Sequence, residues 1–203
     1  MKLMLTSSGL DTPKIKKKFL SLINKKVQNT KIAVIHTIQK PQYIEFVNNV
    51  GRELVKTGLL HPHISYIDIT RKKPSIKLSD YDAVYVCGGN TFYILDRLRK
   101  TGLYKSLKEF AKSGGVYIGS SAGSIIASSD ISLAGWGSEA DKNEINLKDL
   151  NGLNLTKISV FPHYKIRLKK EVEEFQKTVD YPVQKLKDRQ ALIIKGKTLQ
   201  LLN

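Results

Sequence analysis

The chain has 203 residues, of which 41% are hydrophobic and 26% are charged, and its formal net charge is +16. This composition is typical of a globular protein and excludes a disordered or fibrous chain; we expect one domain over residues 1–203. No apolar run approaches the roughly 20 residues that span a bilayer, and the N-terminal residues lack the apolar core of a signal peptide. We therefore expect a cytoplasmic protein with no membrane partner.

The positive charge comes mainly from lysine, since arginine occurs at only six positions. Arginine is the side chain that best forms bidentate contacts with phosphates and bases, and no nucleic-acid-binding motif accompanies the lysines. We interpret the charge as a solvated basic surface and expect no specific nucleic acid partner. A basic protein that binds anions or nucleic acid is the alternative that the charge leaves open.

Short apolar runs alternate with amphipathic helical patterns along the first part of the chain. The predicted elements are, in order, a strand at Lys2–Thr6, a helix capped by Thr12 with Pro13 at its first position, a strand at Lys31–His36, a helix from Pro41 to Gly58, and a strand at His63–Ile69.

The same alternation continues after a basic connection at 71–80. The predicted elements are a strand at Tyr81–Cys87, a helix capped by Thr91, a helix from Leu103 to about Lys112, a strand at Val116–Gly119, an irregular excursion from Asp130 to Asn151, a strand at Leu155–Phe161, a helix at Lys165–Lys177 and a hairpin at Gln190–Leu202 turned at Gly196–Lys197. Apolar, β-branched strands that alternate with helices predict an α/β fold with a mostly parallel sheet covered on both faces.

The segment Gly119–Ser120–Ser121–Ala122–Gly123 lies between a strand pattern and an apolar stretch with helical spacing. Gly-x-Ser-x-Gly in that position is the pattern of a nucleophile elbow, a tight turn that exposes the central serine. Small flanking residues are needed because the backbone is strained and neighbouring chain passes close by. The pattern indicates Ser121 as a nucleophile, and the alternative is a glycine-rich turn with an ordinary serine.

A serine hydroxyl needs a neighbouring base to become a good nucleophile, and the chain has four histidines. His36 lies inside a strand pattern, and we interpret it as a core or edge residue. His61 and His63 have no third ligand nearby, so we expect no metal site there. His163 directly follows a predicted strand, and the carboxyl ends of parallel strands share one edge of a sheet. We therefore choose His163 as the base.

The base usually needs a carboxylate that fixes its tautomer. The candidates between the serine and the histidine are not ranked by the residues alone: Asp130, Glu139, Asp141, Glu144 and Asp149. An oxyanion hole needs backbone N–H donors, and we expect one from Gly88–Gly89–Asn90 and one from Ala122. The alternative for the glycine pair is a phosphate-binding turn or a plain loop, although the pattern of a P-loop is absent.

Three segments together resemble the peptidase E family of serine peptidases, family S51: VYVCGGNTFYILDRLRKTGL at 84–103, YIGSSAGSIIAS at 117–128 and NGLNLTKISVFPHY at 151–164. This family includes α-aspartyl dipeptidases and cyanophycinases. The resemblance implies a three-layer αβα fold with a mostly parallel sheet and a nucleophile elbow, similar to class I glutamine amidotransferases (flavodoxin-like). It also implies a serine peptidase without cofactor that cleaves short peptides, including dipeptides with an N-terminal aspartate, through a Ser-His-Asp/Glu triad and an acyl-enzyme.

Carried over to the matching positions, the resemblance implies Ser121 as nucleophile, His163 as general base and Asp141 as the acid, with Glu139 and Glu144 as alternatives for the acid. It further implies Gly89 and Ala122 at the oxyanion hole, and we expect Asn90, Thr91 and Arg167 to bind substrate.

The chain departs from the family pattern at two places. Cys87 replaces the usual third glycine of GGGN, and we interpret it as a buried small residue rather than a reactive thiol. After PHY comes Lys165–Ile166–Arg167, where relatives often carry hydroxyl or acidic residues. This second departure leaves the substrate preference open, and a hydrolase-like domain that binds a small metabolite is a further alternative.

Overall fold

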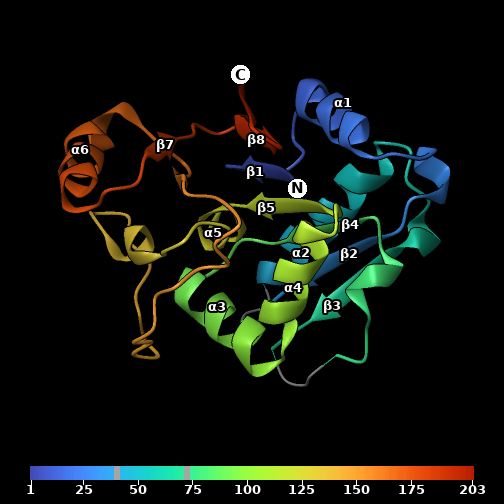
Figure 1. Ribbon diagram of the computed structural model, residues 1–203, viewed down its shortest axis with the longest axis horizontal. Coiled ribbons are helices and arrows are strands. Elements are labelled where there is room, and N and C mark those ends of the chain that lie inside the picture. Colours follow the sequence, from blue (N-terminus) through green and yellow to red (C-terminus); the bar gives the residue numbers. More distant parts are fainter. Residues whose placement is uncertain (39–41, 71–73) are drawn as a thin grey trace.

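A seven-stranded sheet forms the centre of the protein in the computed structural model, which describes residues 1–38, 42–70 and 74–203 (Figure 1). The strands are β1 (Lys2–Thr6), β2 (Ile32–His36), β3 (Ile64–Asp68), β4 (Ala83–Val86), β5 (Val116–Ser120), β8 (Ala191–Lys195) and β9 (Thr198–Leu202). Their order is β3-β2-β4-β5-β1-β8-β9. The strands from β3 to β1 are parallel, whereas β8 runs antiparallel to β1 and β9 antiparallel to β8.

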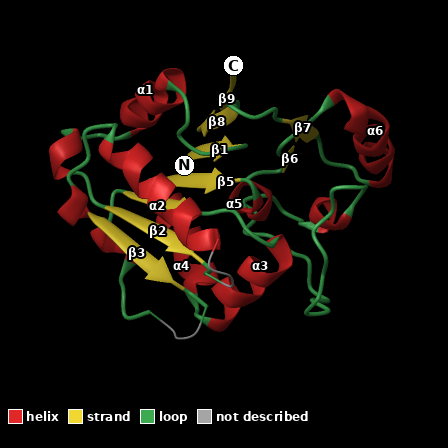
Figure 2. Cartoon of the chain, turned by 180° about the vertical axis from the view of Figure 1, so that it is seen from behind, coloured by secondary structure: helices red, strands yellow, loops and turns green. Residues whose placement is uncertain are grey.

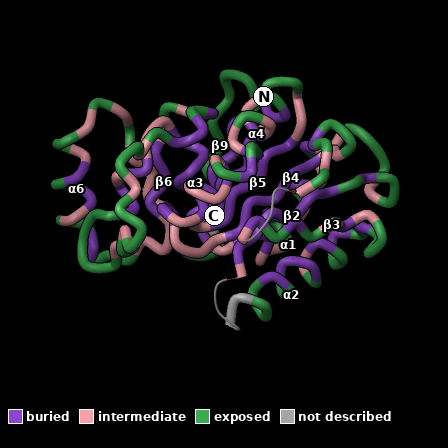
Figure 3. Tube along the Cα trace, turned by 90° about the horizontal axis from the view of Figure 1, so that it is seen from below, coloured by how far each residue is buried: buried purple, intermediate pink, exposed green. Residues whose placement is uncertain are grey.

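Helices cover both faces of this sheet (Figure 2). On one face lie α1 (Pro13–Leu22) and α2 (Gln42–Val55); on the other lie α3 (Thr91–Lys100), α4 (Leu103–Lys112) and α5 (Ala122–Ile126). Alternate residues of β1 serve the two cores, because Leu3 and Leu5 pack with the second group of helices while Met4 packs with the first. Buried residues accordingly follow the strands (Figure 3). The predicted three-layer fold with a mostly parallel sheet is confirmed.

A smaller unit flanks the main sheet, with α6 (Lys169–Thr178) at its outer side (Figure 1). Its two strands, β6 (Ser159–Phe161) and β7 (Val183–Lys185), form a separate parallel pair. Five buried side chains make its core: Leu133, Phe161, Leu168, Val172 and Phe175. Short 3₁₀ turns complete the fold at Val27–Asn29, His61–His63, Leu78–Asp80, Ser132–Gly135 and Ile166–Leu168.

The strand predicted from Leu155 is wrong in length and in partner. Only Ser159–Phe161 is extended in a ladder, and it pairs with β7 instead of the main sheet. The preceding backbone bonds to the end of α5, since the N–H groups of Leu153 and Leu155 donate to the carbonyls of Ile126 and Ala127. The strand β7 was not predicted, because its half-buried Val-Gln-Lys shows no apolar alternation.

Two helix starts also differ from the prediction. The cap of α3 is Asn90 rather than Thr91, because the Asn90 side chain accepts a hydrogen bond from the Tyr93 N–H at 3.0 Å. Helix α6 begins at Lys169 rather than Lys165, after a 3₁₀ turn. The predicted start at Pro41 lies outside the described residues. Within the described part of the chain, no helix is both long and apolar enough to cross a membrane.

Candidate active site

The turn from β5 into α5 holds Ser121 in a strained backbone conformation, with φ 51° and ψ −115°. The turn is tight enough to require glycine on both sides. A Cβ atom at Gly119 would lie 2.5 Å from the Gly123 carbonyl oxygen, and one at Gly123 would lie 2.2 Å from the Val86 carbonyl oxygen. The Ser121 N–H donates to the Thr6 carbonyl at 3.0 Å. Glycine spacing and this bond together hold Ser121 at the carboxyl edge of the sheet.

His163 follows β6, and its ring reaches across to the elbow. Its Nε2 atom lies 3.0 Å from the Ser121 Oγ, within hydrogen-bond distance. The backbone of His163 is left-handed, with φ 53°, a conformation that side chains other than glycine adopt at a cost. The small β6–β7 sheet therefore brings a residue that is distant in sequence beside Ser121.

The carboxylate at His163 belongs to Asp188, in the segment between β7 and β8. The His163 Nδ1 lies 2.6 Å from the Asp188 Oδ1. The same oxygen accepts hydrogen bonds from the hydroxyls of Ser7, at 3.1 Å, and Ser8, at 2.8 Å. The expectation that Asp141 holds the histidine ring is wrong, and so is the search confined to carboxylates between Ser121 and His163.

The order of the strands explains why Asp188 was missed. Because β8 is antiparallel to β1, the residues just before β8 lie at the edge where the parallel strands end. The hairpin at the end of the chain was predicted, and its antiparallel placement beside β1 would have pointed to Asp188. Nothing in the local sequence indicates that placement.

The hydrogen bonds at Asp188 also set its charge. Burial raises the pKa of its carboxyl, but hydrogen bonds from Ser8 and His163, together with the charge of His163 and a bond from Ser7, lower it below its ordinary value. The group is therefore ionised at neutral pH, and it loses its charge only as the pH falls below the ordinary carboxyl range. An ionised carboxylate only accepts, so the neutral form of His163 carries its proton on Nδ1 and presents Nε2 as an acceptor to the Ser121 hydroxyl.

Asp141 lies instead at the start of α3. Its Oδ2 accepts hydrogen bonds from the N–H of Thr91 at 2.8 Å and from the Thr91 Oγ at 2.6 Å. A carboxylate at this place satisfies a free amide of the first helical turn and faces the positive end of the helix dipole. Next to it, the Asn90 side chain donates to the Lys142 carbonyl at 2.8 Å. Asn90 and Thr91, two of the three residues that we expected at the substrate, thus hold the excursion 130–151 against α3, and Thr91 also lines the cavity beside Ser121.

The excursion is held on its other side by the flanking unit. Glu139 forms ion pairs with Arg167 and, at 3.6 Å, with Lys165. The N–H and the hydroxyl of Ser138 both donate to the carboxylate of Glu171 on α6, at 2.8 Å each. Arg167 is therefore engaged by a carboxylate. The remaining alternative acid, Glu144, is exposed.

These contacts enclose a cavity of about 140 Å³ beside the elbow. Ser121, Ala122 and His163 line it together with Gly89, and the excursion contributes Leu133, Ala134, Trp136, Glu139 and Asp141. The two residues expected to supply the oxyanion donors thus line the same cavity as the serine. The excursion forms a wall of this cavity, with an apolar part and two carboxylates.

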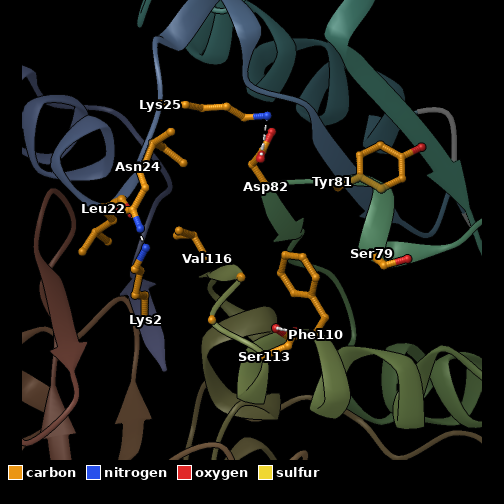
Figure 4. Close-up of a pocket in the computed structure, with 13 residues that line it drawn as sticks. Lys2, Leu22, Asn24, Lys25, Ser79, Tyr81, Asp82, Phe110, Ser113 and Val116 are labelled. Atoms are coloured by element: carbon orange, nitrogen blue, oxygen red, sulfur yellow. Dashed lines mark hydrogen bonds and ion pairs between the residues drawn. The ribbon is translucent and has the colours of Figure 1, made fainter.

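A larger groove, of about 460 Å³, lies at the opposite edge of the sheet, where β1 and β5 begin (Figure 4). Its charged groups already have protein partners: Lys25 pairs with Asp82 at 2.8 Å, and the Lys2 ammonium donates to the Leu22 carbonyl at 3.0 Å. Among the described residues that line it, there is no histidine. The smaller cavity is the candidate active site because it contains the Ser121–His163 contact.

Two other residues singled out in the sequence lie in the core. His36 is 7% exposed on β2, and burial lowers the pKa of its imidazole although Asp68 opposes the shift. Cys87 is 1% exposed, and burial raises the pKa of its thiol. A buried thiol that stays protonated is unreactive.

Comparison with known proteins links the whole chain to one family. A family model described as peptidase family S51 matches residues 3–202. A relative named uncharacterized peptidase Lmo0363, from Listeria monocytogenes, is 31% identical over 202 residues, which are 96% of this chain and 95% of the relative. A Streptomyces coelicolor protein named peptidase E is 29% identical over 133 residues, covering 61% of this chain and 53% of that protein.

A solved structure gives the same result for the fold. It is a candidate peptidase E protein from Listeria monocytogenes, with a TM-score of 0.78 and 27% sequence identity. The similarity covers 100% of this chain and 98% of that one.

The position of Asp141 generates a test of its structural role. Asp141→Ala removes two hydrogen bonds to Thr91, and we expect it to lower the free energy of unfolding by about 1–2 kcal/mol and to speed hydrogen exchange at the Thr91 amide. Denaturant unfolding and amide exchange measure these effects. The control Glu144→Ala changes an exposed carboxylate and should stay within about 0.5 kcal/mol of the parent. Equal effects of the two substitutions would contradict the role.

Proposed function

Because the chain belongs to peptidase family S51 and is a serine-type peptidase, we propose that it hydrolyses short peptides through Ser121, His163 and Asp188. The observation that carries this proposal is the continuous chain of contacts at the site. The Ser121 Oγ lies 3.0 Å from the His163 Nε2, and the His163 Nδ1 lies 2.6 Å from the Asp188 Oδ1. A nucleophile, a base and a group that orients the base are the arrangement that activates a serine.

The proposed reaction begins when the Ser121 Oγ attacks the carbonyl carbon of the peptide bond and its proton passes to the His163 Nε2. The ionised Asp188 stabilises the imidazolium that forms. His163 then gives the proton to the leaving amine as the C–N bond breaks, which leaves an acyl-enzyme on Ser121. Water, deprotonated by His163, hydrolyses the ester and releases the acid product.

The negative charge of both tetrahedral intermediates develops on the former carbonyl oxygen. We assign the N–H groups of Gly89 and Ala122 as its donors, because both residues line the cavity beside Ser121. Ala122 is the first residue of α5, and the first N–H groups of a helix have no partner within the helix.

The size and charge of the cavity support short substrates with a free N-terminus. A space of about 140 Å³ accommodates little more than one residue on the acyl side of the scissile bond. Glu139 and Asp141 in its wall suit the ammonium group of an N-terminal residue. Lys165 and Arg167 pair with Glu139 just outside this lining, and a substrate carboxylate bound there would exchange with Glu139 for one of these two cations. We propose dipeptides with an N-terminal aspartate as the preferred substrates.

The nucleophile is tested by Ser121→Ala. We expect this variant to lose turnover by a factor on the order of 10⁴ to 10⁶, because no acyl-enzyme forms. The substitution should also abolish covalent labelling by a fluorophosphonate, measured by intact mass. The control is Ser124→Ala, since the Ser124 hydroxyl is buried and bonds to backbone carbonyls. A Ser121→Ala protein that keeps the parent rate would contradict the assignment.

The acid is tested by Asp188→Asn against Asp141→Asn. An amide at position 188 donates as well as accepts and carries no charge, so it no longer fixes the Nδ1–H tautomer of His163. We expect the rate of fluorophosphonate labelling at Ser121 to fall on the order of 10² to 10⁴-fold. Asp141→Asn should lower that rate much less. A larger loss of labelling rate in Asp141→Asn than in Asp188→Asn would indicate that Asp141, and not Asp188, is the acid.

Substrate preference is tested with matched dipeptides. We expect kcat/KM for Asp-Leu to exceed that for Leu-Leu by about tenfold or more, corresponding to about 1.4 kcal/mol of transition-state binding. N-acetyl-Asp-Leu, which lacks the ammonium group, should be cleaved more slowly than Asp-Leu. Chromatographic assay of the released leucine measures all three. Equal rates for Asp-Leu and Leu-Leu would refute the preference for aspartate.

A further inference from the structure

Ser7 is the first residue after β1, and its side chain is completely buried. It does not line the cavity beside Ser121. Its Oγ nevertheless contacts two of the three proposed catalytic residues, His163 and Asp188. It accepts a hydrogen bond from the His163 backbone N–H at 2.8 Å and donates one to the Asp188 Oδ1 at 3.1 Å.

The direction of these two bonds follows from chemistry. A backbone N–H only donates and an ionised carboxylate only accepts, so the single hydroxyl proton of Ser7 points at Asp188. The hydroxyl therefore accepts from the backbone of His163 and donates to the carboxylate that holds its ring, and so links the two. An alanine has neither function, and it would leave the His163 N–H without its partner.

The position of Ser7 at the end of β1 explains why this link affects the geometry of the site. Ser121 belongs to the main sheet, whereas His163 follows a strand of the separate β6–β7 pair. Thr6 pairs with Ser120, and the Thr6 carbonyl accepts from the Ser121 N–H. Ser7 is thus one residue away from the anchor of the nucleophile, and its hydroxyl is bonded to the base. It joins two sheets at the point where their relative position decides the distance from Ser121 to His163.

The backbone of His163 is left-handed, a conformation that costs free energy and that the surrounding structure must hold. The residues around it are held by the small sheet, since Leu186 accepts from the Tyr164 N–H and donates to the Phe161 carbonyl. The amide of His163 itself is held by Ser7. We propose that Ser7 is a positioning residue, which acts through His163 and Asp188 to keep the imidazole in line with the Ser121 hydroxyl. This inference rests on the proposed function.

Ser8 offers a matched comparison within the chain. Its hydroxyl donates to the same Asp188 oxygen, at 2.8 Å, but it makes no described contact with His163. Ser8→Ala therefore removes a bond to the carboxylate only, while Ser7→Ala removes the link between the carboxylate and the histidine backbone as well.

The experiment measures the rate constant for fluorophosphonate labelling of Ser121, which requires no knowledge of the substrate. We expect Ser7→Ala to lower it about 10- to 100-fold, with a fall in kcat rather than a rise in KM when a cleaved peptide is used. Ser8→Ala should cause a clearly smaller loss. Nuclear magnetic resonance of the ring protons gives an independent readout: the Nδ1–H resonance of His163 should shift or broaden in Ser7→Ala more than in Ser8→Ala.

A folded Ser7→Ala protein that labels at the parent rate would overturn the inference, and so would equal losses in the two variants. If Ser7→Ala does not fold, the rate of hydrogen exchange at the His163 amide in the parent protein tests the link instead. A protected His163 amide supports the link, and exchange at the rate of a free amide refutes it. A parent chain that the fluorophosphonate does not label contradicts the proposed function itself, and this inference with it. Labelling of the parent with no effect of Ser7→Ala overturns the inference alone.

Discussion

The backbone at the end of β5 passes closer to its neighbours than any side chain would allow, and the geometry of the site depends on that approach. Cβ atoms at Gly119 and Gly123 would lie 2.5 Å and 2.2 Å from carbonyl oxygens. With hydrogen at both positions, the chain turns from strand to helix within one residue and leaves Ser121 with φ 51°. The Thr6 carbonyl then binds the Ser121 amide. A strained serine is held in place by a close-packed sheet edge, so its hydroxyl is presented without freedom to relax.

The base and the acid reach this edge from elements outside the parallel strands. His163 comes from a two-stranded sheet with its own small core, and Asp188 comes from the segment before an antiparallel strand. Their mutual contact is electrostatic as well as geometric. Because hydrogen bonds and the nearby imidazole keep Asp188 ionised, this carboxylate favours the Nδ1–H tautomer of the neutral His163 ring.

The carboxylates in and beside the excursion 130–151 have different structural roles. Asp141 binds the first turn of α3, and Glu139 pairs with basic residues after His163. Glu171 of α6 accepts a hydrogen bond from the Ser138 backbone N–H. These three contacts fasten a segment with little regular structure on two sides. They create the wall of a cavity whose lining combines apolar side chains with negative charge. Of the two carboxylates in this lining, Glu139 is paired with Arg167 and Lys165, and Asp141 is bonded to Thr91.

Much of this protein was determined by local sequence. Short apolar runs specified the strands of the main sheet, and Gly-x-Ser-x-Gly between strand and helix specified the turn at Ser121, because steric limits on backbone and Cβ atoms act over a few residues. The partner of His163 was decided only by tertiary structure. Asp141 and Asp188 are both short acidic side chains in irregular segments, and no local pattern separates them. Which one meets the imidazole depends on the antiparallel entry of β8 beside β1 and on the pairing of β6 with β7, and strand pairing between distant segments is set by the packing of the whole chain.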